Sequence, residues 1–184
     1  MEAVQPSVSI REKNIVLIGF MGVGKTTIGR KLAQKLYRPF VDIDEEIEKE
    51  YGMTVTEIFK QLGEKEFRKK EKEIIAHYCQ QKLMVISLGG GAFLQKEIQD
   101  LCLKYCIVIY LDISWESWKE RLNILIDNRP VLQGKSLEEI KELFYKRQRI
   151  YSRHNSKITT DNRNVDEIVD YLFESLKLAW ELYE

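Results

Sequence analysis

The chain has 184 residues, of which 44% are hydrophobic and 32% are charged, a balance typical of globular proteins and not of disordered or fibrous ones. Its 29 basic residues equal its 29 acidic residues, so no nucleic-acid partner is expected, because such partners require a clustered cationic face. Cys79, Cys102 and Cys106 form no Cys-x-x-Cys pair, which indicates free thiols in a reducing, cytoplasmic compartment and no metal site.

The N-terminal residues 1–13 are expected to form a flexible tail. They include charged side chains and lack the apolar segment of a signal peptide. The longest apolar runs elsewhere are far shorter than the roughly 20 residues that cross a bilayer, so no membrane partner is expected. Residues 14–184 contain no repeat, low-complexity tract or linker, and predict a single domain that we expect to be monomeric.

The elements begin with a continuous apolar run over 14–18, typical of a strand buried on both faces of a sheet. A glycine-rich loop follows, and the spacing of apolar residues then alternates between helical and strand-like. In chain order, the pattern predicts a helix over 25–36, a strand over 40–43, helices over 44–51 and 56–81, a strand over 84–88, a helix over 95–104, a strand over 107–111, a helix over 114–122, an exposed loop over 123–134, a helix over 136–151, a strand over 157–160, and a helix from 165 to the C-terminus.

Strands that alternate with helices predict a parallel sheet covered on both faces, here a three-layer α/β/α fold with five strands. Ligands of such folds bind at the carboxyl ends of the strands. The glycine-rich loops and the acidic pair described below all follow predicted strands, which is where that rule requires them.

The strongest motif is Gly19-Phe-Met-Gly-Val-Gly-Lys-Thr26, which matches G-x-x-x-x-G-K-[ST] at every fixed position. It follows a buried strand and opens a helix, so backbone N–H groups and the helix dipole can surround phosphates. Lys25 adds a charge toward the β- and γ-phosphates, and the Thr26 hydroxyl is a direct Mg²⁺ ligand. The motif alone indicates a nucleoside triphosphate and fits GTPases, ATPases and metabolite kinases alike. Expected ATP contacts from this motif are Gly22, Val23, Gly24, Lys25, Thr26 and Thr27.

Two acidic residues, Asp42 and Asp44, come just after the second strand and are expected to point to the same side. Carboxylates beside a phosphate loop can hold Mg²⁺ through water and accept a proton from an attacking hydroxyl. Asp44 could also cap the helix that follows, and the two roles are compatible.

Three further features have both an ordinary and a functional interpretation. Arg68 and Glu71 share a helix face, either as a solvated ion pair or as a guanidinium fork for a carboxylate. The glycines at 89–91 either form a flexible turn or allow a ligand to approach the backbone closely. Arg129 lies in the exposed loop, either as a surface residue or as the cation of a lid over about 122–134. Arg147 is similarly either solvated or directed at an acceptor anion.

In this order and spacing, the chain resembles the shikimate kinases from about Lys13 to its end. The resemblance rests on the phosphate loop, Asp42-Ile-Asp44, Ile58-Phe59 with Gly63-Glu64, and Phe67-Arg68-x-x-Glu71. It continues with Leu88-Gly89-Gly90-Gly91, Tyr110-Leu111-Asp112, Arg129-Pro130, and Arg147 four residues before Tyr151. It implies a P-loop fold like that of nucleoside monophosphate kinases. It also implies transfer of a phosphoryl group from MgATP to the 3-hydroxyl of shikimate, in the pathway to chorismate and the aromatic amino acids.

The resemblance also implies roles for the residues. Asp44 contacts the acceptor hydroxyls and is the candidate base, and Asp42 supports Mg²⁺ through water. The acceptor region then covers about 42–81, with Arg68 and Arg147 on the carboxylate. The remaining implied roles are Glu71 orienting Arg68, Gly90 donating its N–H to the substrate, Gly89 and Gly91 shaping that turn, Arg129 as the lid arginine, and Arg163 near adenine. Asp112 is interpreted as a loop or cap residue.

Some segments depart from the family pattern. The lid segment 122–128 is unusually apolar and lacks an additional arginine before Arg129. Arg149 stands where proline is frequent, so Arg147 and Arg149 could exchange roles. The rival functions are another small-metabolite kinase of the gluconate type and a non-catalytic nucleotide-binding protein of the same family.

Overall fold

The computed structural model describes residues 8–126 and 129–183. The strands are β1 (Asn14–Ile18), β2 (Phe40–Asp42), β3 (Val85–Ser87), β4 (Cys106–Asp112) and β5 (Ser156–Thr159). They are parallel and form one sheet in the order β2-β3-β1-β4-β5, which confirms the predicted five-stranded parallel sheet. The central strand β1 is buried along its whole length, as its continuous apolar run predicts.

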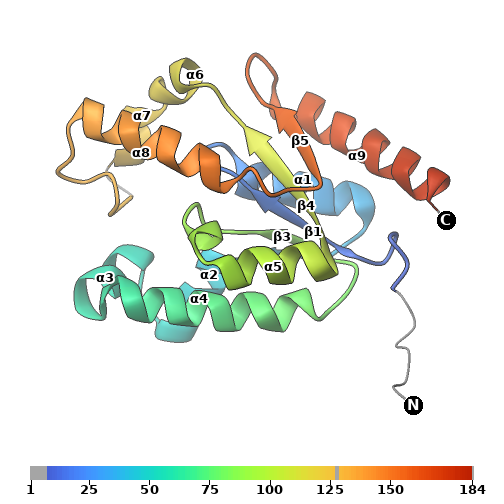
Figure 1. Cartoon of the computed structure of the whole chain (residues 1–184), viewed down its shortest axis with the longest axis horizontal. Helices are drawn as coiled ribbons and strands as arrows, with labels where there is room; N and C mark the ends of the chain where they lie inside the picture. The colour runs from blue at the N-terminus through green and yellow to red at the C-terminus, as the bar shows by residue number, and fades with distance from the viewer. Residues whose placement is uncertain (1–7, 127–128, 184) are drawn as a thin grey trace.

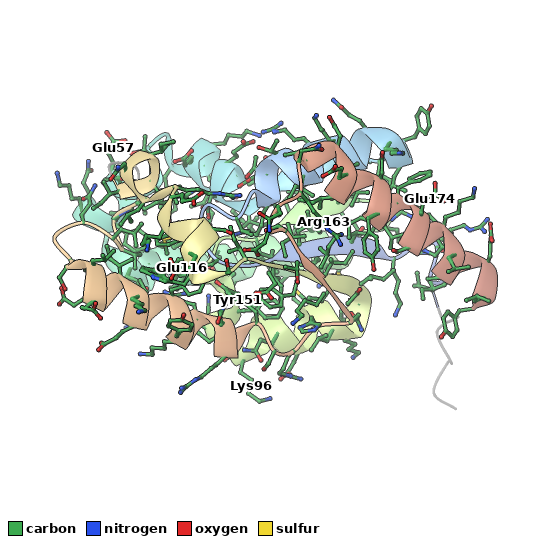
Figure 2. All side chains as sticks on the ribbon, turned by 90° about the horizontal axis from the view of Figure 1, so that it is seen from above. Glu57, Lys96, Glu116, Tyr151, Arg163 and Glu174 are labelled. Carbon is green, nitrogen blue, oxygen red and sulfur yellow. The ribbon has the colours of Figure 1, made fainter. Side chains whose placement is uncertain are left out.

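Helices cover both faces of this sheet. The helices α1 (Lys25–Leu36) and α9 (Val165–Leu182) lie together on one face, and α5 (Lys96–Tyr105) and α8 (Leu137–Ile150) lie on the other (Figure 1). The view from above separates the same two layers and shows Tyr151 toward the middle of the molecule, whereas Lys96 lies at the rim (Figure 2). This arrangement confirms the predicted three-layer fold class.

Three helices connect β2 to β3 on the acceptor side, namely α2 (Ile43–Tyr51), α3 (Val55–Gln61) and α4 (Gly63–Cys79). The prediction of one continuous helix over 56–81 was wrong. Gly63 has a φ of +84°, a left-handed conformation that costs glycine little, and the chain changes direction there between α3 and α4. The predicted strand over 40–43 also ends earlier than expected, because Asp42 is the N-cap of α2.

The segment before the lid differs from the expectation of one helix over 114–122 followed by an exposed loop. Two short helices, α6 (Trp115–Lys119) and α7 (Leu122–Leu125), replace it. The side chains of Leu122, Leu125 and Ile126 pack against the hydrophobic core, which explains why this part of the predicted lid is apolar. Residues 127–128 of that lid, and residues 1–7 of the predicted tail, lie outside the described residues.

Cys79, Cys102 and Cys106 are buried and free, as the thiol interpretation requires. Within residues 8–126 and 129–183, every helix is too short or too polar to cross a membrane.

Candidate active site

The site lies where the carboxyl ends of β1, β2 and β3 meet. Leu17 of β1 and Asp42 of β2 are both paired with Ser87 of β3, so the three strands end side by side. The phosphate loop leaves β1, Asp42 closes β2, and a glycine turn over 89–91 follows β3. Parallel strands therefore bring together segments that are far apart in the sequence.

The phosphate loop is compact and positively charged. Gly24, with a φ of +110°, is the N-cap of α1, so the first-turn N–H groups of a twelve-residue helix face the loop. The Lys25 ammonium folds back over the loop and donates to the carbonyl oxygens of Gly19 (2.7 Å) and Phe20 (3.1 Å). Burial lowers the pKa of Lys25 to about 8, and the nearby Arg129 acts in the same direction. The buried Lys25 and the partly exposed Arg129 thus place two positive charges near each other, which suits a polyanionic ligand.

Two side chains whose oxygen atoms could bind a metal ion, Thr26 and Asp42, lie beside the phosphate loop. The Thr26 hydroxyl donates to Oδ2 of Asp42 at 2.6 Å. The other carboxylate oxygen of Asp42 accepts from the backbone N–H groups of Asp44 (3.0 Å) and Glu45 (3.3 Å). The expected pair on one side of a strand is therefore a helix cap, with Asp42 as the N-cap and Asp44 in the first turn of α2. A hydroxyl and a carboxylate are ligands that Mg²⁺ accepts alongside waters and phosphate oxygens, so these residues fit that ion.

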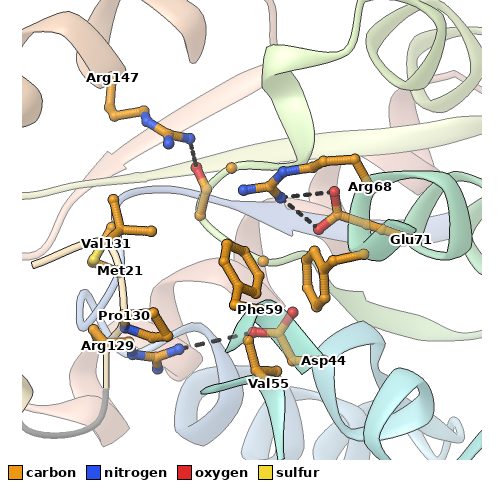
Figure 3. Close-up of a pocket in the computed structure, with 14 residues that line it drawn as sticks. Met21, Asp44, Val55, Phe59, Arg68, Glu71, Arg129, Pro130, Val131 and Arg147 are labelled. Carbon is orange, nitrogen blue, oxygen red and sulfur yellow. Dashed lines mark hydrogen bonds and ion pairs between the residues drawn. The ribbon is translucent and has the colours of Figure 1, made fainter. Parts of the chain in front are cut away.

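Asp44 faces a pocket on the other side of the loop (Figure 3). Its Oδ1 atom is buried and has no hydrogen-bond partner among residues 8–126 and 129–183, and its Oδ2 atom lies 3.8 Å from Nη1 of Arg129. Burial raises the pKa of Asp44 to about 6; the neighbouring Asp42 adds to the increase and Arg129 opposes it. An orphaned buried oxygen is costly, and a ligand hydroxyl would satisfy it.

The opposite wall of the pocket is cationic (Figure 3). Nη1 of Arg68 donates to both oxygens of Glu71, at 2.9 and 3.1 Å, and Glu71 is fully buried. Nη1 of Arg147 donates to the Gly90 carbonyl at 3.2 Å. A Cβ atom at Gly91 would lie 2.3 Å from Nη2 of Arg68 and 2.8 Å from Nη1 of Arg147, so the two guanidinium groups converge over that glycine. Such a pair suits a carboxylate, which accepts several charge-assisted hydrogen bonds.

The cationic wall of the pocket and the phosphate loop are connected through Asp44 and Arg129. Asp44 and Arg129 line this pocket and also a neighbouring pocket that contains Thr26 and Asp42. An acceptor held at the arginine wall would therefore reach Asp44 at the boundary with the nucleotide side. This geometry suits transfer of a phosphoryl group to a hydroxyl of a carboxylic acid.

Comparison with known proteins agrees with this geometry. The family model "Shikimate kinase" matches residues 21–177. The chain is 58% identical over 175 residues to the shikimate kinase of Oceanobacillus iheyensis, covering 95% of this chain and 96% of the relative. The chain belongs to the shikimate kinase family. It is also 55% identical over 181 residues to the shikimate kinase of Bacillus pumilus, covering 98% of each. A solved shikimate kinase from Acinetobacter baumannii, in complex with shikimate, matches with a TM-score of 0.85 and 32% identity over 91% of this chain and 94% of that one.

Most of the predicted acceptor residues of this shikimate kinase family member lie around one pocket. Asp44, Arg68, Glu71, the glycines 89–91, Arg129 and Arg147 all line it. Of the two arginines that could face the acceptor, the structure favours Arg147, because Arg147 is buried in the pocket wall while Arg149 is exposed. The expectation of a loop or cap residue at Asp112 was wrong: Asp112 is the last residue of β4, pairs with Thr159 of β5, and accepts a hydrogen bond from the Tyr110 hydroxyl at 2.9 Å.

Arg121 is a site residue that the sequence analysis overlooked. The expectation that an additional arginine is missing from 122–128 holds for those residues, but Arg121 lies immediately before them. Its Nη1 atom donates to the carbonyls of Gly22 (2.9 Å) and Val23 (3.2 Å) in the phosphate loop. Arg121 and Arg163 line one further pocket, next to the phosphate loop. Arg121 lies between the short helices α6 and α7, and the apolar pattern did not reveal this break, so the role of Arg121 was missed.

Tyr151 and Gln95 were also not predicted as site residues. The buried Tyr151 hydroxyl donates to the Gly90 carbonyl, the atom that Arg147 also contacts. Gln95 donates to Glu71 across the gap between α5 and α4. Both residues support groups that line the pocket. A single sequence shows no signal for such roles, because neither residue type implies a chemical function.

Proposed function

We propose that this chain transfers the γ-phosphoryl group of ATP to the 3-hydroxyl of shikimate and releases shikimate 3-phosphate and ADP. The observation that carries the proposal is the pairing of Arg68 and Arg147 over Gly91, opposite Asp44 at the edge of the phosphate loop. This arrangement suits an acceptor with a carboxylate at one end and a hydroxyl at the other. Membership of the shikimate kinase family supports the same assignment.

On the nucleotide side, the backbone of residues 22–27 surrounds the phosphates. Lys25 leaves its contacts with the loop carbonyls and places its charge against the β- and γ-phosphates. Arg121 and Arg163 contact the nucleoside end of ATP, which is supported by the pocket that they share.

Thr26 would bind Mg²⁺ directly and Asp42 would hold it through water, a proposal that their 2.6 Å hydrogen bond supports. When bound, the ion neutralises charge on the β- and γ-phosphates. The protein's own contribution is to fix the positions of these two oxygen ligands, because Asp42 is in turn held by the N–H groups of α2.

On the acceptor side, Arg68 and Arg147 bind the carboxylate of shikimate, with Glu71 orienting Arg68 and the Gly90 N–H contacting the substrate. Asp44 accepts a hydrogen bond from the 3-hydroxyl and aims its oxygen at the γ-phosphorus. A transition state that is largely metaphosphate-like needs little proton removal, so Asp44 contributes more through orientation than through basicity. Arg129 closes with the lid and adds positive charge to the transferring group.

Coupled measurement of ADP release tests this proposal. MgATP is offered with shikimate, with gluconate, and with no acceptor, and the expected result is release that depends on shikimate. Release with gluconate but not shikimate would favour a gluconate-type kinase, against which the arginine pair argues. ATP binding without acceptor-dependent release would indicate a non-catalytic nucleotide-binding protein.

The proposal extends to the state of the protein in the cell. We infer a monomer in the cytoplasm, where a reducing environment suits the three free, buried thiols. Sedimentation velocity over a range of concentrations tests the monomer, since a dimer would sediment faster as concentration rises.

A further inference from the structure

Gln95 occupies the N-cap position of α5, yet its side chain makes no capping hydrogen bond. It turns away from its own helix toward α4. There, its Nε2 atom donates to Oε1 of Glu71 at 3.2 Å and to the backbone carbonyl of Arg68 at 3.2 Å. One amide therefore contacts both members of the ion pair that forms the cationic wall of the pocket.

Glu71 needs this kind of support because it is a fully buried carboxylate. The charged groups that face it are Arg68 on α4, Asp44 on α2 and the more distant Arg147 on α8. Asp44 repels the Glu71 charge, whereas Arg68 attracts it. Gln95 adds a neutral donor from a fourth direction, which stabilises the carboxylate without introducing another cation that would compete with Arg68.

We propose that Gln95 is a positioning residue for the acceptor carboxylate, acting through Glu71 and the α4 backbone to fix the direction of the Arg68 guanidinium. This inference rests on the proposed function, because the acceptor is the molecule that Arg68 binds. Gln95 is not among the residues that line the pocket, whereas Arg68 and Glu71 both line it, so Gln95 acts on the pocket through that pair.

Replacing Gln95 with methionine keeps a similar length and removes the donor. The KM for shikimate is expected to rise about tenfold, as for loss of one hydrogen bond to a charged group, while the KM for ATP and kcat change less than about twofold. The pH profile should change as well. Burial already raises the pKa of Glu71 to about 7. Loss of a donor to the charged form raises that pKa further, so the acid limb of kcat/KM for shikimate should move to higher pH.

Gln99 provides a matched control one turn later on α5. Its Nε2 atom also donates to a backbone carbonyl, that of Phe93, at 2.6 Å, and its Oε1 atom accepts from Arg153 at 3.0 Å, but among the described residues it makes no hydrogen bond to the Arg68–Glu71 pair. Gln99→Met is therefore expected to leave the KM for shikimate and the acid limb unchanged.

The experiment compares wild type, Gln95→Met, Gln95→Glu and Gln99→Met for both KM values, kcat and the pH profile. Gln95→Glu is nearly isosteric and places a carboxylate beside Glu71, so it should move the acid limb of kcat/KM to higher pH at least as far as Gln95→Met does. It also provides the test if Gln95→Met fails to fold. If the wild type depends on shikimate but Gln95→Met and Gln99→Met have equal kinetics, the inference is overturned. It is also overturned if Gln95→Met raises the KM for shikimate and the KM for ATP equally. A wild type without shikimate-dependent activity would instead overturn the proposed function.

Discussion

The half-buried Asp44 and the fully buried Glu71 are two carboxylates that both face the position that a Cβ atom would take on Gly89. A Cβ atom at Gly89 would lie 2.8 Å from Oδ1 of Asp44 and 3.2 Å from Oε2 of Glu71. Burial raises the pKa of both groups, to about 6 for Asp44 and about 7 for Glu71. Desolvation therefore opposes the ionisation of both groups, which costs folding stability where function requires charge.

Asp44→Asn should separate these two effects. The amide cannot accept a hydroxyl proton and orients the acceptor poorly, so we expect kcat to fall by about 100-fold or more. Stability should move the other way. The pKa of Asp44 is higher in the folded state than its ordinary 3.8, so ionisation above about pH 6 costs stability. Removing that charge should raise the free energy of unfolding at about pH 8 by about 1 to 3 kcal/mol, from about 1.36 kcal/mol per pKa unit.

The stability gain of Asp44→Asn should depend on pH, which provides an internal control. Below the unfolded pKa, near about pH 3.5, Asp44 is protonated in both states, so the stability gain of Asp44→Asn should disappear there. Urea unfolding at several pH values measures the gain. Near-normal turnover of the variant with shikimate and ATP would remove Asp44 from the mechanism, and an equal stability gain at every pH would contradict the buried-charge explanation.

Gly91→Ala tests the convergence of the two guanidinium groups. Its Cβ atom would lie 2.3 Å from Arg68 and 2.8 Å from Arg147, so both side chains must move away from the pocket. We expect the Kd for shikimate to rise by about 100-fold, as for a misplaced carboxylate clamp, with the Kd for ATP unchanged. Isothermal titration with each substrate separately makes the comparison. Unchanged shikimate affinity would mean that the arginines do not bind the acceptor at this point.

At the scale of elements, α6 and the turn after it support the phosphate loop from outside. The indole N–H of Trp118 donates to the Met21 carbonyl at 2.7 Å in a buried setting, and Arg121 contacts the carbonyls of Gly22 and Val23. The carbonyls of Met21, Gly22 and Val23 are thus paired with side chains from a neighbouring element, which helps to hold the loop in the conformation that suits phosphate.

Trp118→Phe should remove one of these supports. It leaves the buried Met21 carbonyl without its donor, so we expect a loss of about 1 to 3 kcal/mol in unfolding free energy and weaker ATP binding. Trp115→Phe is the matched control, because Trp115 stacks on Trp118 in the same aromatic cluster and the change in volume is the same. Fluorescence-monitored unfolding and ATP titration compare the two variants. If both lose the same ATP affinity, the effect comes from packing and not from the bond to Met21.

Much of this arrangement could be predicted from the sequence, for reasons that differ between elements. The phosphate loop and β1 were predictable because their motif and apolar run depend on local geometry. The break at Gly63 was missed because the apolar pattern continues across it, and only the backbone conformation ends α3. Asp42 was predicted as a magnesium helper but not as a helix cap, because the end of β2 depends on tertiary pairing with β3.

In the lid segment, the apolar composition did not reveal which residues are packed against the rest of the protein. Its apolar residues suggested an exposed but unusual loop, whereas Leu125 packs directly against Gly22: a Cβ atom on that glycine would lie 2.4 Å from a Leu125 methyl carbon. The apolar character of this part of the segment therefore reflects contact with the phosphate loop and the core. A contact between residues so far apart along the chain leaves no signal in a single sequence.

At the scale of the whole molecule, one hydrophobic core connects the sheet to both helical layers. It extends from Ile15 in the central strand to Trp180 near the end of α9, and includes Phe67 and Ile74 of the acceptor helix α4. The pocket beneath the two arginines lies on this core, because the core residues Met21 and Phe67 line it. Acceptor and nucleotide sides should therefore unfold together, as expected of the single domain proposed for residues 14–184.

Thermal unfolding tests this cooperativity. We expect one transition, with the far-UV signal of the backbone and the near-UV signal of the tryptophans changing at the same temperature. A ligand that binds the folded state stabilises it by about 2.7 kcal/mol at a concentration of about 100 times Kd, and about 2 to 4 °C per kcal/mol is typical for this chain length. Shikimate and MgADP should therefore each raise the midpoint by about 5 to 10 °C for both signals equally. A ligand that shifted only one signal, or split the transition, would show that the acceptor helices α2 to α4 unfold separately from the sheet, because binding energy would then reach only the part that holds the ligand.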